Sequence, residues 1–188
     1  MSTQPTPRLT PAEYLTLERS AVIKGEYFDG EIFAMAGASR AHNLIVGNLV
    51  GELREQLRKG PCEVYPSDMR VKVDRTGLYT YPDVVVVCDE PQFEDEHGDT
   101  LLNPTLLIEV LSESTEKYDR GKKSSHYRQL PSLQEYLLVS QEEPHLEHYA
   151  RQDNEHWLLT EATGLETRIE LPALQATIEL SEVYARVT

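Results

Sequence analysis

The spacing of apolar residues predicts two helices in the first third of the chain. From Ser39 to Lys59, apolar side chains recur every three or four positions, as they do on one face of an amphipathic helix. Upstream, the stretch TPAE at residues 10–13 has the form of a capping box with proline at the first helical position. We therefore expect a short helix through residues 11–20 and a longer one after Ser39.

Strand patterns lie on both sides of the longer helix. Asp29-Gly30 separates EYF from EIFAM, which predicts a hairpin with a two-residue turn. Beyond the helix, CEVYPSDMRVKV and LYTYPDVVVVCD are rich in valine and tyrosine, which favours strands. The unbroken run VVVV in the second of these indicates a strand that is buried on both faces.

The second half of the chain alternates loops, strands and one cationic helix. The acidic segment 90–100 predicts a solvated loop that leads to a buried strand, TLLIEVLS. Residues 114–130 predict a cationic helix interrupted by Gly121, and LQEYLLVS predicts another strand. Short strands and turns follow, before a last helix that begins at Ser181. These elements predict an α+β fold with a central mixed sheet flanked by helices.

The length bounds the number of domains. A chain of 188 residues is long enough for one domain with a good core and short for two. We expect a single domain over residues 1–188, with a core over about residues 10–140 and a β-rich C-terminal extension over 141–188.

Composition excludes several classes of protein. No apolar run approaches the roughly 20 residues that span a bilayer, and the start MSTQPTPRLT lacks an apolar leader, so we expect a cytoplasmic protein with no membrane partner. The net charge of −14 argues against generalised binding to nucleic acid. Cys62 and Cys88 have no metal-binding spacing, and we expect two buried free thiols.

Glu109 is the first candidate for chemistry, because it places a carboxylate in the middle of the apolar run NPTLLIEVLS. A buried carboxylate costs several kcal/mol unless it is paired, protonated or bound to a cation. Asp83 stands at the mouth of the preceding buried strand, so two neighbouring strands would bring both acids together. Two carboxylates suffice to hold Mg²⁺, which keeps waters and phosphate oxygens as its other ligands.

These acids also carry a resemblance. YPDVVVV followed by LLIEVLS is similar to the PD-(D/E)XK nuclease superfamily, in which the two acids hold a metal beside a lysine. The order GEYFDGEIFAM, the helix that contains His42, YPDVVVV, LLIEVLSEST, YDRGKK and LQEYLLV resembles the Uma2 (DUF820) family of endonucleases over roughly residues 10–140. The resemblance implies a restriction-endonuclease-like fold.

One departure from the superfamily pattern concerns its lysine. Leu111 occupies the position two residues after Glu109, where the superfamily has a lysine. In Uma2-like sequences a lysine on the helix after YDR reaches the site, and Lys123 matches it here, with Lys122 beside it. The same resemblance implies that Glu26 completes the metal shell through a water, with Glu31 as the weaker candidate.

The implied function is metal-dependent hydrolysis of phosphodiester bonds in DNA. Asp83 and Glu109 would bind Mg²⁺ or Mn²⁺, and Lys123 would orient a metal-activated water or neutralise developing negative charge. Residues 113–128 carry a local net charge of +2, so Lys117 and Arg120 would face the substrate phosphate. A homodimer is expected, since two sites related by two-fold symmetry cut both strands most simply.

A purely structural role also stays open for several of these residues. Asp83 could be a turn residue after Pro82, and Glu109 could lie on an edge strand or pair with a core arginine. His42, in the first turn of its helix, is more often a structural hydrogen-bonding group than a base. Two other functions also stay open: a catalytically silent module that binds nucleic acid or protein, and a hydrolase of a small phosphorylated substrate.

Overall fold

The computed structural model describes residues 8–113, 115–153 and 155–187, so residues 1–7, where we expected no leader segment, lie outside the described residues. The predicted α+β class is confirmed, because helices and mixed sheets alternate along the chain. The helical segments are α1 (Pro11–Glu18), α2 (Arg40–Leu57), α3 (Glu116–Tyr118), the π-helical segment η1 (Asp119–Lys123), α4 (Ser124–Tyr127) and α5 (Leu180–Val183).

The larger of the sheets is a mixed sheet of six strands in the order β11-β10-β9-β8-β6-β3. Only its β8–β9 pair is parallel among these neighbours, and the other pairs are antiparallel. Its strands are β3 (Glu63–Pro66), β6 (Val84–Val87), β8 (Leu106–Leu111), β9 (Glu135–Ser140), β10 (His145–Arg151) and β11 (Trp157–Thr163).

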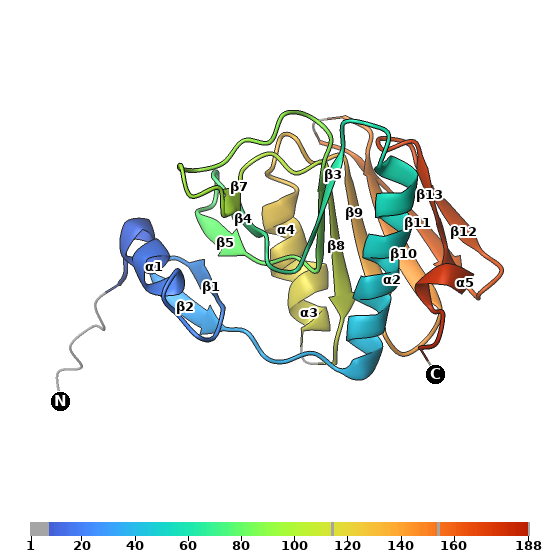
Figure 1. The fold of residues 1–188 in the computed structure, drawn as a ribbon, viewed down its shortest axis with the longest axis horizontal. Helices are drawn as coiled ribbons and strands as arrows, with labels where there is room; N and C mark the ends of the chain where they lie inside the picture. The colour runs from blue at the N-terminus through green and yellow to red at the C-terminus, as the bar shows by residue number, and fades with distance from the viewer. Residues whose placement is uncertain (1–7, 114, 154, 188) are drawn as a thin grey trace.

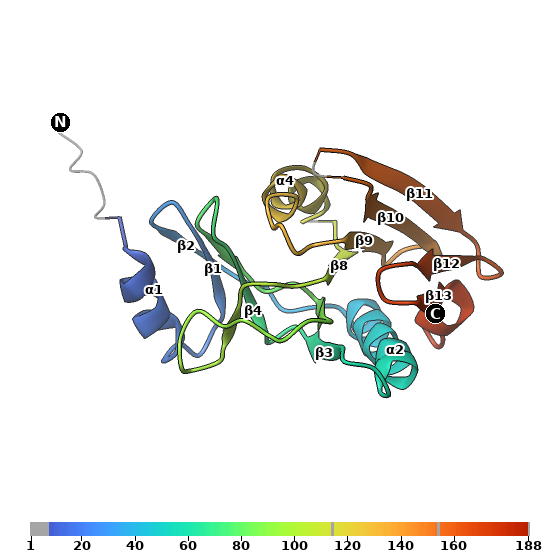
Figure 2. The ribbon, with the colours of Figure 1, turned by 90° about the horizontal axis from the view of Figure 1, so that it is seen from above.

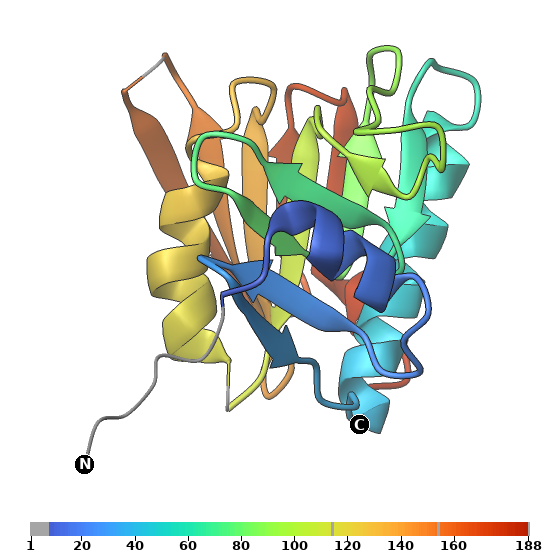
Figure 3. The ribbon, with the colours of Figure 1, turned by 90° about the vertical axis from the view of Figure 1, so that its left-hand side faces the viewer.

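Two further sheets flank it. A five-stranded sheet has the order β2-β1-β5-β4-β7, and a two-stranded hairpin pairs β12 with β13. Their strands are β1 (Gly25–Phe28), β2 (Glu31–Ala34), β4 (Arg70–Val73), β5 (Leu78–Thr80), β7 (Thr100–Leu101), β12 (Arg168–Leu171) and β13 (Ala176–Glu179). Helix α1 and the β1–β2 hairpin stand in front of the larger sheet in Figure 3.

The larger sheet separates two hydrophobic clusters. Helix α2, the β12–β13 hairpin and α5 cover one face, where Ile45, Leu49 and Leu53 pack against β6, β8 and β9. The segment from α3 to α4 covers the other face, together with strands β4 and β5. Figure 2 shows α2 and α4 on opposite sides of the sheet. Glu109 faces the side of α4, because it alternates with Ile108 and Val110 of the first cluster.

The two predicted helices and the first hairpin form as expected. Helix α1 has the complete capping box between Thr10 and Glu13, and α2 is capped by the Ser39 hydroxyl. The hairpin turns at Asp29 and Gly30, whose φ angles of 50° and 87° are those a tight turn of this kind requires. Within the described residues, no helix combines the length and the apolarity needed to cross a membrane.

Two predicted strands are wrong in their extent. The stretch 62–73 forms β3 and β4, which belong to different sheets, and the stretch 78–89 likewise forms β5 and β6. Within these two stretches the chain therefore passes between the sheets twice, and the second of these crossings, at residues 81–83, contains Pro82. Proline has no N–H for a ladder, so it favours a break in the pairing there.

The prediction of free thiols is also wrong, because Cys62 and Cys88 form a disulfide. Glu63 pairs with Val87 in the antiparallel β3–β6 ladder, which places the two cysteines opposite each other at the next position. No local sequence pattern carries this register, which depends on how β3 pairs with β6.

The acidic loop between β6 and β7 is less solvated than predicted. The carboxylate of Asp99 accepts hydrogen bonds from Arg19 and forms an ion pair with Arg70, which is 2% exposed. Glu94 accepts a hydrogen bond from Lys72 at 2.8 Å. These acids serve to tie the loop to α1 and β4.

Two smaller predictions need correction. The cationic helix is not broken at Gly121, because α3, η1 and α4 follow one another without a gap and accommodate the glycine within a π-helical turn. The last helix begins at Leu180 rather than Ser181.

Candidate active site

Glu109 lies at the centre of a cluster of charged side chains on the face of β8 that is covered by η1 and α4. Its side chain is 6% exposed, and Tyr127 of α4 donates a hydrogen bond to Glu109 Oε1 at 2.6 Å. Lys123 of η1 lies with its Nζ 2.9 Å from the same oxygen. The charge that the sequence left unexplained is therefore offset by an ammonium from the next helical segment.

Asp83 is held beside Glu109 by two donors. It directly precedes β6, and the backbone N–H of Val110 donates to Asp83 Oδ2 at 2.8 Å. Its other oxygen, Oδ1, lies 2.9 Å from Nε2 of His42, in the first turn of α2. The structure thus brings the two acids together from the neighbouring strands β6 and β8, and His42 orients the Asp83 carboxylate.

Glu26 of β1 reaches the same cluster from the smaller sheet. Its Oε1 lies 3.0 Å from Lys123 Nζ and accepts a hydrogen bond of 2.5 Å from the Thr80 hydroxyl. Lys123 is 5% exposed and thus bridges acids from two sheets. The structure brings together Asp83, Glu109, Lys123 and Glu26, which the sequence had proposed as one set.

Asp119 also belongs to the cluster, although no sequence signal had assigned it. It is 3% exposed, and its Oδ1 lies 3.7 Å from Lys123 Nζ, one helical turn away. The spacing of four between Asp119 and Lys123 in YDRGKK could have revealed the contact, because such residues are neighbours on a helix surface. Tyr127 gave no comparable signal, since its contact with Glu109 depends on tertiary packing.

Burial and the closeness of several carboxylates favour the binding of a proton or another cation at this cluster. Burial raises the pKa of the Glu109 carboxyl well above its ordinary value; Lys123 acts against this, while Asp119 and Asp83 raise it further. Burial also raises the pKa of the Asp119 carboxyl. For Lys123, burial alone would lower the pKa, but the carboxylates of Glu109, Glu26 and Asp119 outweigh it and keep the ammonium charged.

The donor set fits a hard divalent cation. The carboxylates of Glu26, Glu109 and Asp119 surround the ammonium of Lys123, and that of Asp83 is near enough to Glu109 to raise its pKa, so negative charge is in excess. Oxygen ligands of this kind suit Mg²⁺ or Mn²⁺. Asp83 and Glu26 keep side-chain exposures of 15% and 12%, which places the solvent-facing edge of the cluster at these two acids.

The other residues proposed from the sequence lie outside this cluster. Glu31 is exposed at the hairpin turn, where it pairs with Phe28. Lys117 and Lys122 are exposed on the helical segment above the site. Arg120 donates hydrogen bonds to Glu116 and Glu147, so its charge is already matched within the chain.

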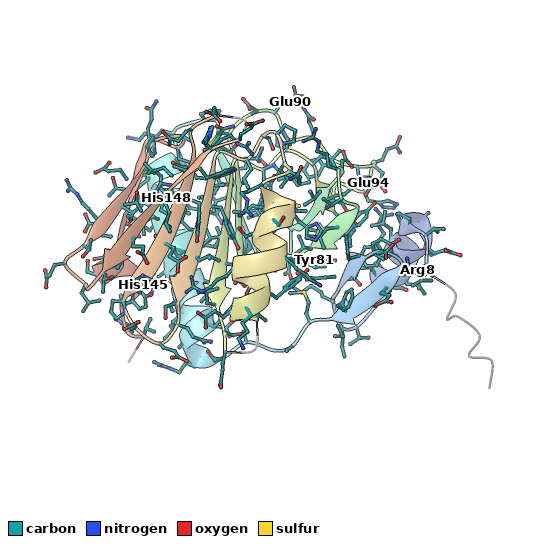
Figure 4. The ribbon with its side chains drawn as sticks, turned by 180° about the vertical axis from the view of Figure 1, so that it is seen from behind. Arg8, Tyr81, Glu90, Glu94, His145 and His148 are labelled. Carbon is teal, nitrogen blue, oxygen red and sulfur yellow. A yellow bond between two sulfur atoms is a disulfide. The ribbon has the colours of Figure 1, made fainter. Side chains whose placement is uncertain are left out.

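A second group of metal-ligand residues lies on β10 and β11. Ligand atoms of His145, Glu147 and Glu161 lie within 4.8 Å of one another. In Figure 4, His145 lies on one side of the α3–α4 segment, and Tyr81, two positions before Asp83, lies on the other side. Both Glu147 oxygens already accept hydrogen bonds, one from Arg120 and one from Tyr149. Arg120 offsets one of the two carboxylates of this group, whereas the single ammonium of Lys123 faces three, so this group is the weaker candidate for a cation.

Comparisons with known proteins identify relatives of similar length. The chain is 42% identical over 162 residues to "Uncharacterized protein sll1609" of Synechocystis sp., an alignment that covers 86% of this chain and 92% of that protein. It is 38% identical over 180 residues to "Uncharacterized protein slr1290" of the same organism, covering 96% and 93%.

The fold matches a solved structure described as a putative nuclease belonging to DUF820 from Anabaena variabilis. The TM-score is 0.77 at 18% sequence identity, over 96% of this chain and 99% of that one. Residues 11–182 match the sequence model of the family described as "Uma2: Putative restriction endonuclease". The resemblance drawn from YPDVVVV, LLIEVLSEST and YDRGKK is thereby confirmed, and the chain belongs to the Uma2 family.

Proposed function

We propose that this protein is a metal-dependent endonuclease that hydrolyses phosphodiester bonds in DNA. The observation that carries the proposal is the convergence of Asp83, Glu109, Glu26 and Lys123 in one largely buried cluster. Membership of the family described as "Putative restriction endonuclease" supports the same reaction class.

In this proposal Asp83 and Glu109 are the direct ligands of Mg²⁺ or Mn²⁺, and Glu26 completes the shell through a water. The cation would supply activation of a water and stabilisation of negative charge on the phosphate. His42 and the Val110 N–H keep the Asp83 carboxylate in one orientation, which avoids the cost of ordering it when the cation binds.

Lys123 has the role of a cationic partner for the reacting groups. Its ammonium donates to acids from β1 and β8, and it stays charged in spite of its burial. An ammonium in a low-dielectric site stabilises developing negative charge more strongly than the same group in water. It would thus orient the attacking water or neutralise charge on the phosphate.

The test combines calorimetric titration of Mn²⁺ with plasmid nicking on the same samples. We expect Asp83→Asn/Glu109→Gln to lower Mn²⁺ affinity at least about 100-fold and nicking about 1,000-fold, because both direct ligands lose their charge. Asp89→Asn/Glu90→Gln is the matched control, since it removes two exposed carboxylates from a loop and should leave both quantities unchanged.

Three other outcomes would redirect the assignment. Loss of Mn²⁺ binding in the control as well would mean that bulk negative charge, and not the cluster, attracts the metal. Binding without nicking would favour the silent module or the hydrolase of a small phosphorylated substrate. Absence of binding in the wild type would contradict the proposal, and Glu109 would then be a structural partner of Lys123.

Four further points stay predictions from the sequence: DNA as the nucleic acid, the homodimer, the cytoplasmic location, and Mg²⁺ or Mn²⁺ as the metal. The disulfide bears on the location, because structural disulfides are rare in reducing compartments. A cytoplasmic enzyme would have to keep the Cys62–Cys88 bond in spite of cellular reductants.

A further inference from the structure

Asp119 has a relation to Lys123 that the other acids of the cluster lack. Glu26 and Glu109 contact Lys123 from strands β1 and β8. Asp119 lies with Lys123 in the same five-residue turn, η1, and its Oδ1 is 3.7 Å from Lys123 Nζ. The backbone of η1 therefore keeps Asp119 near Lys123 even if the contacts of Lys123 with Glu26 and Glu109 are lost.

Binding of a divalent cation would create a conflict at Glu109. The ammonium of Lys123 lies 2.9 Å from Glu109 Oε1 and 3.0 Å from Glu26 Oε1, the carboxylates that the metal shell would need. Two cations on the same buried oxygens repel each other strongly, since charges interact more in a low-dielectric site than in water. The ammonium must therefore give up part of these contacts when the metal binds.

A displaced ammonium needs another anion nearby. Lys123 is 5% exposed, and a buried charge without a partner is strongly unfavourable. Asp119, also buried, is the remaining carboxylate within ion-pair distance of Lys123, as far as the described residues show. The present distance of 3.7 Å between Asp119 Oδ1 and Lys123 Nζ leaves room for a closer contact.

We propose that Asp119 is a positioning residue, which takes up the Lys123 ammonium when a divalent cation occupies Asp83 and Glu109, and so keeps it beside the reacting phosphate. This inference rests on the proposed function, because it requires the cation site. It goes beyond that function in assigning Asp119 an effect on metal affinity that is transmitted through Lys123 alone.

The experiment is a double-mutant cycle read by calorimetric titration of Mn²⁺. We expect Asp119→Asn to weaken Mn²⁺ binding about tenfold, because the ammonium then stays on Glu26 and Glu109. Lys123→Met should tighten binding several-fold by removing the competing cation. In the Lys123→Met background, Asp119→Asn should change the affinity less than about twofold.

Controls separate this coupling from damage to the fold. Thermal unfolding is followed for every variant, and Lys123→Gln replaces Lys123→Met if the latter does not fold. Asp119→Glu, which retains the charge, should restore most of the wild-type affinity. Lys59→Met removes an exposed lysine two residues beyond α2 and should leave Mn²⁺ binding unchanged.

The possible results distinguish this inference from the proposed function. Equal weakening by Asp119→Asn in both backgrounds would mean that Asp119 acts on the metal independently of Lys123, as a ligand or through its charge, and would overturn the inference, as would no effect in either. Mn²⁺ binding without nicking would overturn the nuclease, while the cycle would still decide the role of Asp119. No Mn²⁺ binding by the wild type would overturn both.

Discussion

At the scale of single residues, Glu52 shows how a carboxylate outside the cluster responds to its surroundings. It lies on α2, where one oxygen accepts the backbone N–H of Glu179 and the other, buried, has no hydrogen-bond partner among the described residues. Burial raises the pKa of the Glu52 carboxyl to about 7; the N–H of Glu179 lowers it, and the carboxylates of Glu179 and Glu182 raise it further. The folded protein therefore favours a protonated Glu52.

This shift predicts a stability that depends on pH. A carboxyl whose pKa is raised on folding stabilises the fold fully below its ordinary pKa, near 4.5, and loses that contribution as pH rises to about 7. We expect Glu52→Gln to raise the free energy of unfolding by about 1 kcal/mol at pH 8, because an amide replaces a buried charge. Urea unfolding at pH 8 and at pH 4.5 measures this.

The comparison at acid pH provides the internal control. At pH 4.5 the advantage of Glu52→Gln should shrink, since the wild-type side chain is then protonated in the fold. Glu55→Gln, on an exposed position of the same helix, should show no such dependence. A gain for Glu52→Gln that is the same at both pH values would contradict the shifted pKa.

At the scale of elements, strand β3 shows how a disulfide can hold the edge strand of a sheet in place. The strand pairs with β6 alone in the larger sheet, and Cys62, directly before it, is bonded to Cys88, directly after β6. Since Asp83 directly precedes β6, the bond helps to fix the strand that positions a proposed ligand. Edge strands with one partner are the ones that detach most easily from a sheet.

The bond should therefore contribute measurably to stability. Cys62 and Cys88 are separated by 26 positions, and closing a loop of this size stabilises the folded state by about 3 kcal/mol. We expect Cys62→Ser/Cys88→Ser to lower the free energy of unfolding by about that amount in urea. Dithiothreitol should destabilise the wild type similarly and leave the double variant unaffected; an equal effect on both would exclude the bond as the cause.

At the scale of the whole molecule, the net negative charge opposes the proposed binding of DNA. The net charge is −14, yet the α3–η1 segment beside the cluster exposes Lys117 and Lys122. Arg120, expected to face the phosphate as well, is occupied by Glu116 and Glu147. The two exposed lysines are thus the cations of this segment best placed for a backbone phosphate.

The salt dependence of DNA binding tests this placement. Each lysine that neutralises a phosphate adds about 0.9 to the steepness of log affinity against log salt for duplex DNA. We expect Lys117→Gln/Lys122→Gln to weaken binding and make this slope shallower by about 2, as measured by fluorescence anisotropy in Ca²⁺ to prevent cleavage. Lys59→Gln, at the far end of α2, should leave the slope unchanged. An unaltered slope in the double variant would place the DNA elsewhere.

The sequence by itself determined the elements whose signals are local, and it predicted that Asp83 and Glu109 lie near each other. The capping box before α1, the spacing of three and four in α2 and the turn at Asp29-Gly30 depend on neighbours in the chain, so they could be read directly. The carboxylate of Glu109 inside an apolar strand could be recognised from the sequence in the same way. Burial of an unpaired charge is unfavourable wherever it occurs, so a partner was to be expected.

Only the tertiary structure decided the rest. The division of the strands between two sheets, the disulfide across β3 and β6, and the contact of Glu26 with Lys123 join segments far apart in the chain. Sequence spacing carries no information about such contacts, since they follow from the register of sheets and the packing of helices on them. Asp119 lies between these cases: its spacing from Lys123 was visible, but its burial among three other acids was not.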